Sequence, residues 1–436
     1  GIRNKIGNVI YEKGCELLTN QVFDSYFSEI SNNGKPGFTG TYWNNLDLKG
    51  EVAATQQVST PFNFNNGGNT VYAPGVNLYN FTASYEGIFR PRNSGDYTLV
   101  IEGDDGYRVY VNDKEVINYW GTHASAKREY TLKAIAGKEY KIKIEYMQAG
   151  AEAVLRFDLG IYQQIAPEAV AERVKDADVV IFVGGISPNL EGEEKNFVNC
   201  PGFAGGDRTS IELPEVQRNI LKALKKAGKK VIFVNCSGSA MALVPETQSC
   251  DAILQAWYPG QAGGTAVADI IFGDYNPSGK LPVTFYKNTE QLPDFEDYSM
   301  KGRTYRYMTE TPLFPFGYGL SYTTFQLSKA GLNKRVATIN QPVQFKVNVK
   351  NTGKRDGTEV VQIYIRKADD EEGPVKSLRA FRPVTLKAGK SAAVNITLSP
   401  DAFEFFDPET NTMRIVPGDY EIMYGNSSNT LPENKL

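Results

Sequence analysis

The spacing of apolar residues changes twice along the chain, and these changes constrain the fold more than any other feature of the sequence. From Phe38 to Asp158, apolar and polar residues alternate between Gly, Asn and Asp turns, which is typical of all-β modules. From Ala166, short continuous apolar runs alternate with amphipathic helical stretches. From about Tyr322 the alternation returns. The sequence therefore predicts a multidomain protein with one α/β region and two all-β regions.

The α/β region contains three mostly apolar runs that predict strands, Val179–Val183, Val231–Val234 and Ala252–Trp257. A helix is predicted over Leu213–Ala227, with Pro214 in its first turn and Gly228 at its end. Apolar strands that alternate with helices predict a mainly parallel sheet covered on both faces. The segment Val9–Cys15 is predicted to add a short buried strand to this sheet, after a short helical lead-in.

Because Val9–Cys15 is assigned to the α/β region, the first all-β module is expected to be an insertion within one domain. The predicted domains are an α/β sandwich over residues 1–22 and 164–320, an inserted β-sandwich over 36–162, and an immunoglobulin-like β-sandwich over 321–436. A chain of 436 residues is long enough for two to four domains of this kind.

Charge and composition narrow the possible functions. The 47 basic and 50 acidic residues give a net charge of −3, which argues against a nucleic-acid-binding protein. No apolar run approaches the roughly 20 residues that cross a bilayer. The single histidine, His123, and four cysteines without a CxxC pair cannot assemble a zinc ligand set, and no cofactor is expected. Disulfide pairing stays open. Acid/base chemistry in this chain must therefore rely on carboxylates.

The strongest candidate for such chemistry is the long glycine-rich loop after Val179–Val183, since ligands of parallel α/β sheets bind at the carboxyl ends of strands. This loop carries three carboxylates within four residues, Glu191, Glu193 and Glu194. Neighbouring carboxylates repel one another, so one of them is expected to stay protonated, as a general acid must. An exposed acidic loop is the alternative for any one of the three. Arg208, at the far end of the loop, is predicted to bind substrate or to pair with Asp207.

The other loops give weaker signals. Gly184-Gly185 lacks the spacing of a dinucleotide-binding loop. The segment Asn235–Ala240 lacks the G-x-S-x-G pattern and has no histidine to serve it, so it is interpreted as a tight polar strand exit. The segment Trp257–Gln261 is predicted either to line a sugar site or to pack in the core.

Two long segments carry a resemblance to a known family. Ala252–Phe285 (AILQAWYPGQAGGTAVADIIFGDYNPSGKLPVTF) and Gly302–Phe325 (GRTYRYMTETPLFPFGYGLSYTTF) resemble the second domain of family 3 glycoside hydrolases and its exit. Residues 321–436 resemble the fibronectin type III-like domain of the same family. The segment 36–162, with Gly103-Asp104-Asp105-Gly106-Tyr107, is similar to protective-antigen-type β-sandwich modules.

The resemblance implies a retaining exo-β-glycosidase that is secreted or periplasmic, a β-glucosidase first and a β-xylosidase as the alternative. In the family, an aspartate nucleophile lies on an N-terminal (β/α)8 barrel and a glutamate on the α/β loop is the general acid/base. By this resemblance Glu191 is the first candidate for the acid/base and Glu193 the second. Residues 194–204 interrupt the family's E-x-E-G-x-D-R pattern at this point. The expected partners are a β-linked oligosaccharide or aryl glycoside and the barrel portion, without which the chain is expected to be inactive.

Two features of the inserted module allow a functional and a structural interpretation. Trp120 lies in the aromatic loop Asn118–His123, which is predicted to form one wall of a substrate site or to contribute a core residue. Asp104-Asp105 is predicted to form an acidic turn, with calcium binding as the alternative. A hypothesis from a different class is a non-catalytic carbohydrate-binding assembly of two sandwiches on an α/β scaffold.

Overall fold

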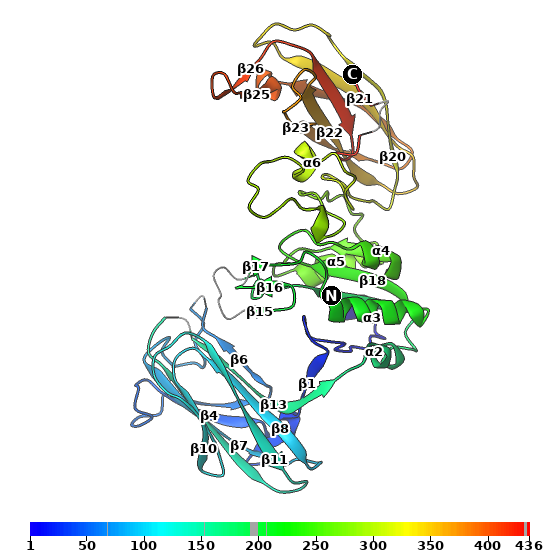
Figure 1. Cartoon of the computed structure of the whole chain (residues 1–436). Helices are drawn as coiled ribbons and strands as arrows, with labels where there is room; N and C mark the ends of the chain where they lie inside the picture. Colours follow the sequence, from blue (N-terminus) through cyan, green and yellow to red (C-terminus); the bar gives the residue numbers. More distant parts are fainter. Residues whose placement is uncertain (68, 152, 192–198, 206, 431–433) are drawn as a thin grey trace. The chain divides into compact units, whose positions relative to one another are not determined.

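The computed structural model describes residues 1–67, 69–151, 153–191, 199–205, 207–430 and 434–436. The chain divides into two compact units, Asn20–Ile165 and a second unit formed by Gly1–Thr19 together with Ala166–Leu436 (Figure 1). Among the described residues, no helix has the length and apolar character required to span a bilayer.

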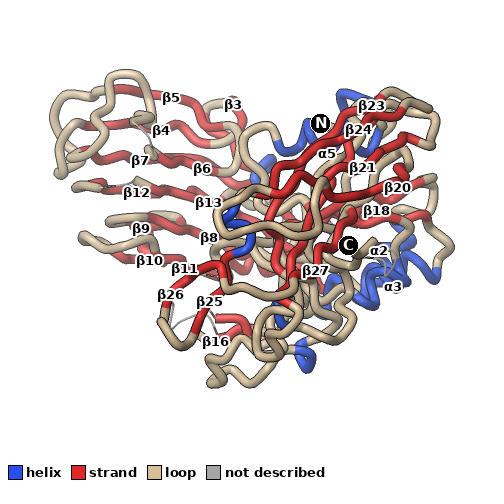
Figure 2. Tube along the Cα trace, turned by 90° about the horizontal axis from the view of Figure 1, so that it is seen from above, coloured by secondary structure: helices blue, strands red, loops and turns tan. Residues whose placement is uncertain are grey.

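The unit Asn20–Ile165 consists of two antiparallel sheets. The first sheet has the strand order β1-β13-β8-β11, with β6 beside β13; its strands are β1 (Gln21–Ser25), β6 (Phe62–Asn65), β8 (Gly95–Gly103), β11 (Ala126–Ala134) and β13 (Val154–Gln164). The second has the order β10-β9-β12-β7-β2-β3, with β4 beside β7 and β5 beside β4 (Figure 2). Its strands are β2 (Ile30–Asn32), β3 (Lys35–Pro36), β4 (Phe38–Trp43), β5 (Ala54–Val58), β7 (Phe81–Phe89), β9 (Tyr107–Val111), β10 (Lys114–Tyr119) and β12 (Tyr140–Gln148).

An aromatic core joins the two sheets. The ring of Phe62 lies 5.6 Å from that of Phe157 in the first sheet and 4.7 Å from that of Tyr85 in the second. The alternation seen in the sequence places these side chains inward because successive strand residues point to opposite faces. A hairpin joins β9 and β10, where Asn112 and Asp113 both have positive φ.

The unit begins earlier in the chain than the predicted boundary at residue 36. Strand β1 pairs with β13, with Gln21 opposite Gln164, and β2 pairs with β7. Because β1 and β13 are antiparallel neighbours, the segment that enters the unit and the segment that leaves it lie side by side.

Asp105 has a structural role in this unit. Its backbone has a φ of 62°, and its buried carboxylate accepts backbone N–H groups of His123 (3.2 Å) and Ala149 (2.8 Å). A longer contact at 3.4 Å comes from Gly150. The carboxylate therefore ties two loops together, as expected of the acidic-turn interpretation of Asp104-Asp105.

The α/β part of the other unit is built on the parallel sheet β14-β18-β19, with strands β14 (Val179–Gly185), β18 (Lys230–Cys236) and β19 (Ala252–Gln255). All three predicted strands are present. The helices are α1 (Ile2–Lys5), α2 (Pro167–Arg173), α3 (Glu215–Lys226), α4 (Val244–Ser249) and α5 (Gly263–Phe272). A small sheet follows β14, with strands β15 (Asn199–Cys200), β16 (Phe203–Ala204) and β17 (Asp207–Arg208).

One expectation for this sheet is wrong. The segment Val9–Cys15 forms no strand, and both Ile10 and Tyr11 are exposed, because no neighbouring strand offers it backbone partners. The sheet is also not covered evenly. Helix α3 contacts β14 and β18, and Val231 and Phe233 are fully buried, but Val179 and Val183 of β14 are 44% and 65% exposed.

The C-terminal part contains two three-stranded antiparallel sheets, β20-β21-β24 and β23-β22-β27, around one apolar core. The elements from residue 289 onward are η2 (Thr289–Gln291), α6 (Thr304–Tyr307), β20 (Phe325–Leu332), β21 (Val343–Asn351), β22 (Gly357–Lys367), β23 (Ser377–Leu386), β24 (Ser391–Leu398), η3 (Pro400–Phe403), β25 (Glu404–Asp407), β26 (Thr412–Ile415) and β27 (Tyr420–Gly425). The buried ion pair between Lys280 and Glu359 joins this part to the segment before it.

Replacing Asp105 with Asn tests its role in the all-β unit. The amide removes one acceptor oxygen that faces backbone N–H groups, so we expect the free energy of unfolding to fall by about 1–3 kcal/mol. Hydrogen exchange at the amides of His123 and Ala149 should become faster. The exposed Asp96→Asn variant is the control and should change neither quantity. A rise in stability on adding calcium to the parent chain would contradict the structural role of Asp105.

Candidate active site

Polar side chains from three loops meet at one end of the parallel sheet. Gly185 of β14 pairs with Cys236 of β18, and Asn235 of β18 pairs with Gln255 of β19, so the three strands end at nearly the same level. The loops that follow carry Glu191, Ser239 and Tyr258 respectively. The carboxyl ends of parallel strands are where ligands bind in sheets of this type.

The half-buried carboxylate of Glu191 is held by two hydroxyl groups. Its Oε1 accepts a hydrogen bond from Ser239 Oγ at 2.8 Å, and its Oε2 accepts one from Tyr258 Oη at 2.5 Å. The backbone N–H of Glu191 donates to the carbonyl of Ser187 at 3.2 Å. The carboxylate is therefore oriented by both neighbouring strand exits.

Arg208 is linked to Glu191 through Ser239. Its Nη1 donates to Ser239 Oγ (3.0 Å) and to the carbonyl of Ala240 (3.2 Å). Burial lowers the pKa of Arg208, and the charge of Glu191 partly offsets that effect. Among the described residues, the side-chain contacts of Arg208 are with Ser239, Ala240 and Ser210 and not with Asp207, because consecutive residues of a strand such as β17 point to opposite sides.

Tyr258 is positioned by an unusual backbone conformation. The preceding residue, Trp257, has a φ of 56°, which is strained for a bulky side chain, and its ring packs 6.1 Å from the buried ring of Phe285. Burial, and then the hydrogen bond to Glu191, raise the pKa of Tyr258 well above its usual value. The phenol therefore stays protonated and donates to Glu191 at any physiological pH.

A chain of hydrogen bonds from Asn235 through Gln255 and Ser237 holds the backbone of Ser239. Asn235 Nδ2 donates to Gln255 Oε1 at 2.6 Å, and Gln255 Nε2 donates to Ser237 Oγ at 3.1 Å. The hydroxyl of Ser237 in turn donates to the carbonyl of Ser239 at 2.9 Å. Buried networks of this kind fix a loop in one conformation because every alternative leaves polar groups unpaired.

The structure brings together some of the predicted site residues. Glu191 and Arg208 share Ser239, whereas Glu193 and Glu194 lie outside the described residues. Trp120 belongs to the other unit, where it is half-buried and stacks with the Arg108 guanidinium 4.0 Å from the ring centre.

Sequence reasoning missed Ser239 and gave Tyr258 only as one of two possibilities. The segment Asn235–Ala240 was interpreted as a structural exit because it lacks a nucleophile motif. The usable signal was that polar residues follow all three parallel strands, which must place them at one edge.

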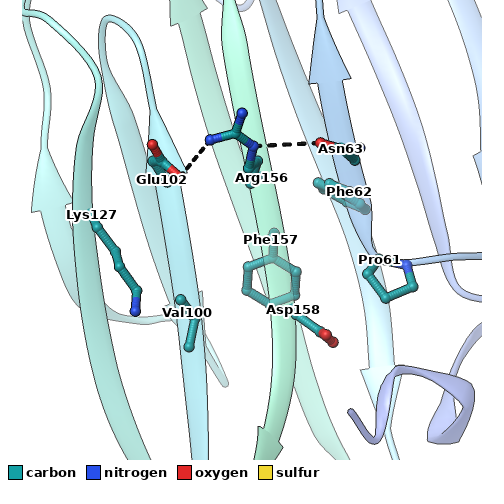
Figure 3. A pocket seen from close by; sticks show the side chains of 9 residues that line it. All are labelled: Pro61, Phe62, Asn63, Val100, Glu102, Lys127, Arg156, Phe157 and Asp158. Atoms are coloured by element: carbon teal, nitrogen blue, oxygen red, sulfur yellow. Dashed lines mark hydrogen bonds and ion pairs between the residues drawn. The ribbon is translucent and has the colours of Figure 1, made fainter. Parts of the chain in front are cut away.

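Other potential sites are weaker. A depression of about 320 Å³ on the all-β unit is lined by strands β6, β8, β11 and β13 (Figure 3). Its Arg156 already donates to Glu102 (2.8 Å) and Asn63 (3.4 Å), so these groups satisfy one another. In the part of the chain that the structure describes, no three His, Cys, Asp or Glu side chains are grouped to hold a metal, and all four cysteines are free.

Comparison with known proteins identifies the family. Residues 10–322 match the model of the glycosyl hydrolase family 3 C-terminal domain, and residues 359–428 match that of the fibronectin type III-like domain. The chain belongs to glycosyl hydrolase family 3. The resemblance predicted from the sequence is thereby confirmed.

Several relatives of this family 3 chain are enzymes. It is 48% identical over 433 residues to a xylan 1,4-beta-xylosidase of Xylanibacter ruminicola, covering 98% of this chain and 50% of that protein. It is 37% identical over 295 residues to a periplasmic beta-glucosidase of Salmonella typhimurium, covering 65% and 37%. The crystal structure of a beta-glucosidase from Kluyveromyces marxianus in complex with glucose matches with a TM-score of 0.73 at 26% identity, covering 98% and 53%. The chain thus spans about half, or less, of the length of these relatives.

Gly238 provides a test of the Glu191–Tyr258 arrangement. A Cβ atom at this position would lie 2.7 Å from the Tyr258 ring and 3.0 Å from Glu191 Oε2, so Gly238→Ala should displace both side chains. We expect the Tyr258 signal in ¹³C-tyrosine NMR spectra, assigned with Tyr258→Phe, to shift in this variant. Gly260→Ala is the matched control, because its Cβ meets nothing within 4 Å. An unchanged Tyr258 signal in Gly238→Ala would mean that the contact does not exist in solution.

Proposed function

We propose that this chain supplies the general acid/base of a retaining exo-β-glycosidase, and that Glu191 is that residue. The observation that carries the proposal is the half-buried Glu191 carboxylate held by Ser239 and Tyr258 at the carboxyl edge of the parallel sheet. In the first step Glu191 protonates the glycosidic oxygen as the leaving group departs. In the second it removes a proton from the water that releases the sugar.

The chemistry of the two partners suits this alternation. An acid/base residue must be held both with and without its proton. Hydroxyl groups accept hydrogen bonds as well as donate them, so Ser239 and Tyr258 can keep Glu191 in place in either state. Arg208 donates only, and its contact to Ser239 rather than to Glu191 avoids pinning the carboxylate permanently in its ionised form.

The nucleophile is proposed to come from an N-terminal (β/α)8 barrel portion, as an aspartate about 5–5.5 Å from Glu191 in the assembled site. Two observations support this partner. The relatives that the chain matches are about twice its length or more. Strand β14 is an apolar edge strand of a parallel sheet, and the exposed Val179 and Val183 are expected to be covered in a complete protein.

Two sugars are candidates for the glycone. A terminal β-D-glucosyl residue is supported by the similarity to glucosidases, including the structure that binds glucose. A β-D-xylosyl residue is supported by the relative named a xylosidase, which matches 98% of this chain, including residues 20–165.

The finer features of the architecture are also part of the proposal. The unit Asn20–Ile165 is proposed to be a protective-antigen-type module inserted into an α/β sandwich domain, with Trp120 beside the leaving-group side of the substrate. The C-terminal sheets are proposed to form an immunoglobulin-like sandwich. A secreted or periplasmic location is proposed, supported by the relative named a periplasmic beta-glucosidase.

Glu191→Gln in the barrel-containing enzyme tests the central assignment. Loss of the acid/base should lower kcat on a 4-nitrophenyl β-glycoside by about 10²–10⁴-fold. The loss should be smaller for a dinitrophenyl glycoside, whose leaving group needs little protonation. Azide or formate should partly restore turnover.

Glu193→Gln is the matched control for this experiment and should retain most of the activity. If Glu193→Gln loses turnover and Glu191→Gln retains it, the acid/base is Glu193. If neither variant loses turnover, the acid/base is another residue, and Glu194 becomes the next candidate. Absence of turnover in the parent enzyme would instead support the hypothesis of a non-catalytic carbohydrate-binding assembly.

A panel of 4-nitrophenyl β-D-glucoside, β-D-xyloside and α-linked counterparts tests the substrate class. We expect the barrel-containing enzyme to turn over a β-linked glucoside or xyloside and none of the α-linked compounds, because its nucleophile and general acid would lie on the two sides of a β-configured glycosidic bond. The relative kcat/KM of the two β-linked compounds decides between the candidate sugars. Turnover of the α-linked compounds alone would contradict the proposed function.

A further inference from the structure

The loop of residues 293–303 presents two aromatic side chains almost entirely to solvent. Phe295 is 92% exposed and Tyr298 is 93% exposed. Residues 294–301, which include Met300, are all exposed. Large apolar groups grouped in one short loop are unusual on a protein surface, and such groups commonly mark binding sites.

The loop is ordered by its own hydrogen bonds and not by packing of these rings. Arg303 donates to the backbone carbonyls of Asp294 (2.9 Å), Asp297 (2.6 Å) and Ser299 (3.2 Å). The Asp294 carboxylate accepts the N–H of Glu296 at 2.9 Å, and that of Asp297 accepts the N–H of Ser299 at 2.8 Å. One arginine therefore closes the loop on itself from within.

These hydrogen bonds hold the backbone that carries the two rings before any ligand binds. A loop whose backbone is already held loses little backbone freedom when a ligand covers its rings, so more of the contact energy appears as affinity. Phe295 and Tyr298 are three residues apart, which places their Cα atoms at most about 10 Å from each other. One short oligosaccharide is long enough to contact both.

The residues around the rings indicate the class of ligand. Asp294, Glu296 and Asp297 are exposed and flank the two rings along the loop, and their carboxylate oxygens accept hydrogen bonds. The faces of a pyranose are apolar and its rim carries hydroxyl donors, so a sugar chain matches rings bordered by acceptors. An apolar protein surface would instead desolvate three carboxylates without pairing them.

We propose that residues 293–303 form a carbohydrate-binding surface, separate from the Glu191 site, that holds a β-linked polysaccharide chain by stacking on Phe295 and Tyr298. The choice of a β-linked glycan rests on the proposed function. Stacking at the loop would keep the enzyme on a polymeric substrate between cleavages at a chain end.

The 436-residue chain itself is sufficient for the experiment. Binding to xylan and to a soluble β-glucan is measured by affinity electrophoresis and by calorimetry with the corresponding hexasaccharides. The double variant Phe295→Ala/Tyr298→Ala should bind at least about tenfold more weakly, as truncation of aromatic anchors usually does. Tyr11→Ala is the control, because Tyr11 is also an exposed aromatic residue (76%) but lies outside the loop.

Further variants separate this surface from the proposed active site. Phe295→Tyr/Tyr298→Phe keeps both rings and should retain binding. Glu191→Gln should also retain binding, whatever its effect on turnover in the barrel-containing enzyme. Three results would overturn the proposal: no glycan binding by the parent chain, unchanged binding by the double alanine variant, or self-association of the chain that the double variant abolishes.

Discussion

The parallel register of β14, β18 and β19 is the constraint on which the candidate site depends. Backbone pairing of Gly185 with Cys236 and of Asn235 with Gln255 makes the three strands end together. The loops that leave the strands must then share one edge of the sheet, and their polar residues come within hydrogen-bond distance. Ser239 and Tyr258 are 48 and 67 residues away from Glu191 in the sequence, yet the three residues form one cluster.

The cluster shows how a carboxylate can be held without being fixed in one charge state. Ser239 and Tyr258 contact Glu191 directly, and both are hydroxyl groups. The permanent charge of Arg208, the buried amide of Asn235 and the half-buried amide of Gln255 act one step further away, through Ser237 and Ser239. Order in the site therefore comes from these more distant groups, while the groups that touch Glu191 can exchange the direction of their hydrogen bonds.

The all-β unit illustrates a different constraint. Strands β1 and β13 are antiparallel neighbours, so the chain enters and leaves the unit at one place. This arrangement allows a β unit with its own core to lie in the sequence between Gly1–Thr19 and Ala166–Leu436, which belong to one compact unit. Asp105 has a comparable local role, since its carboxylate accepts hydrogen bonds from the backbone N–H groups of His123 and Ala149 and so connects two loops.

The sequence by itself determined the elements and the family. Period-2 alternation predicted the all-β region from Phe38 to Asp158, mostly apolar runs predicted β14, β18 and β19, and two long segments predicted family 3. These properties depend on the order and spacing of residues that are close together in the sequence. Tertiary structure alone decided that Val9–Cys15 is not a strand, that Arg208 turns away from Asp207, and that Ser239 and Tyr258 hold Glu191. Each of these outcomes depends on which segment, distant in the sequence, supplies the hydrogen-bond partner. The spacing of residues along the chain does not determine that.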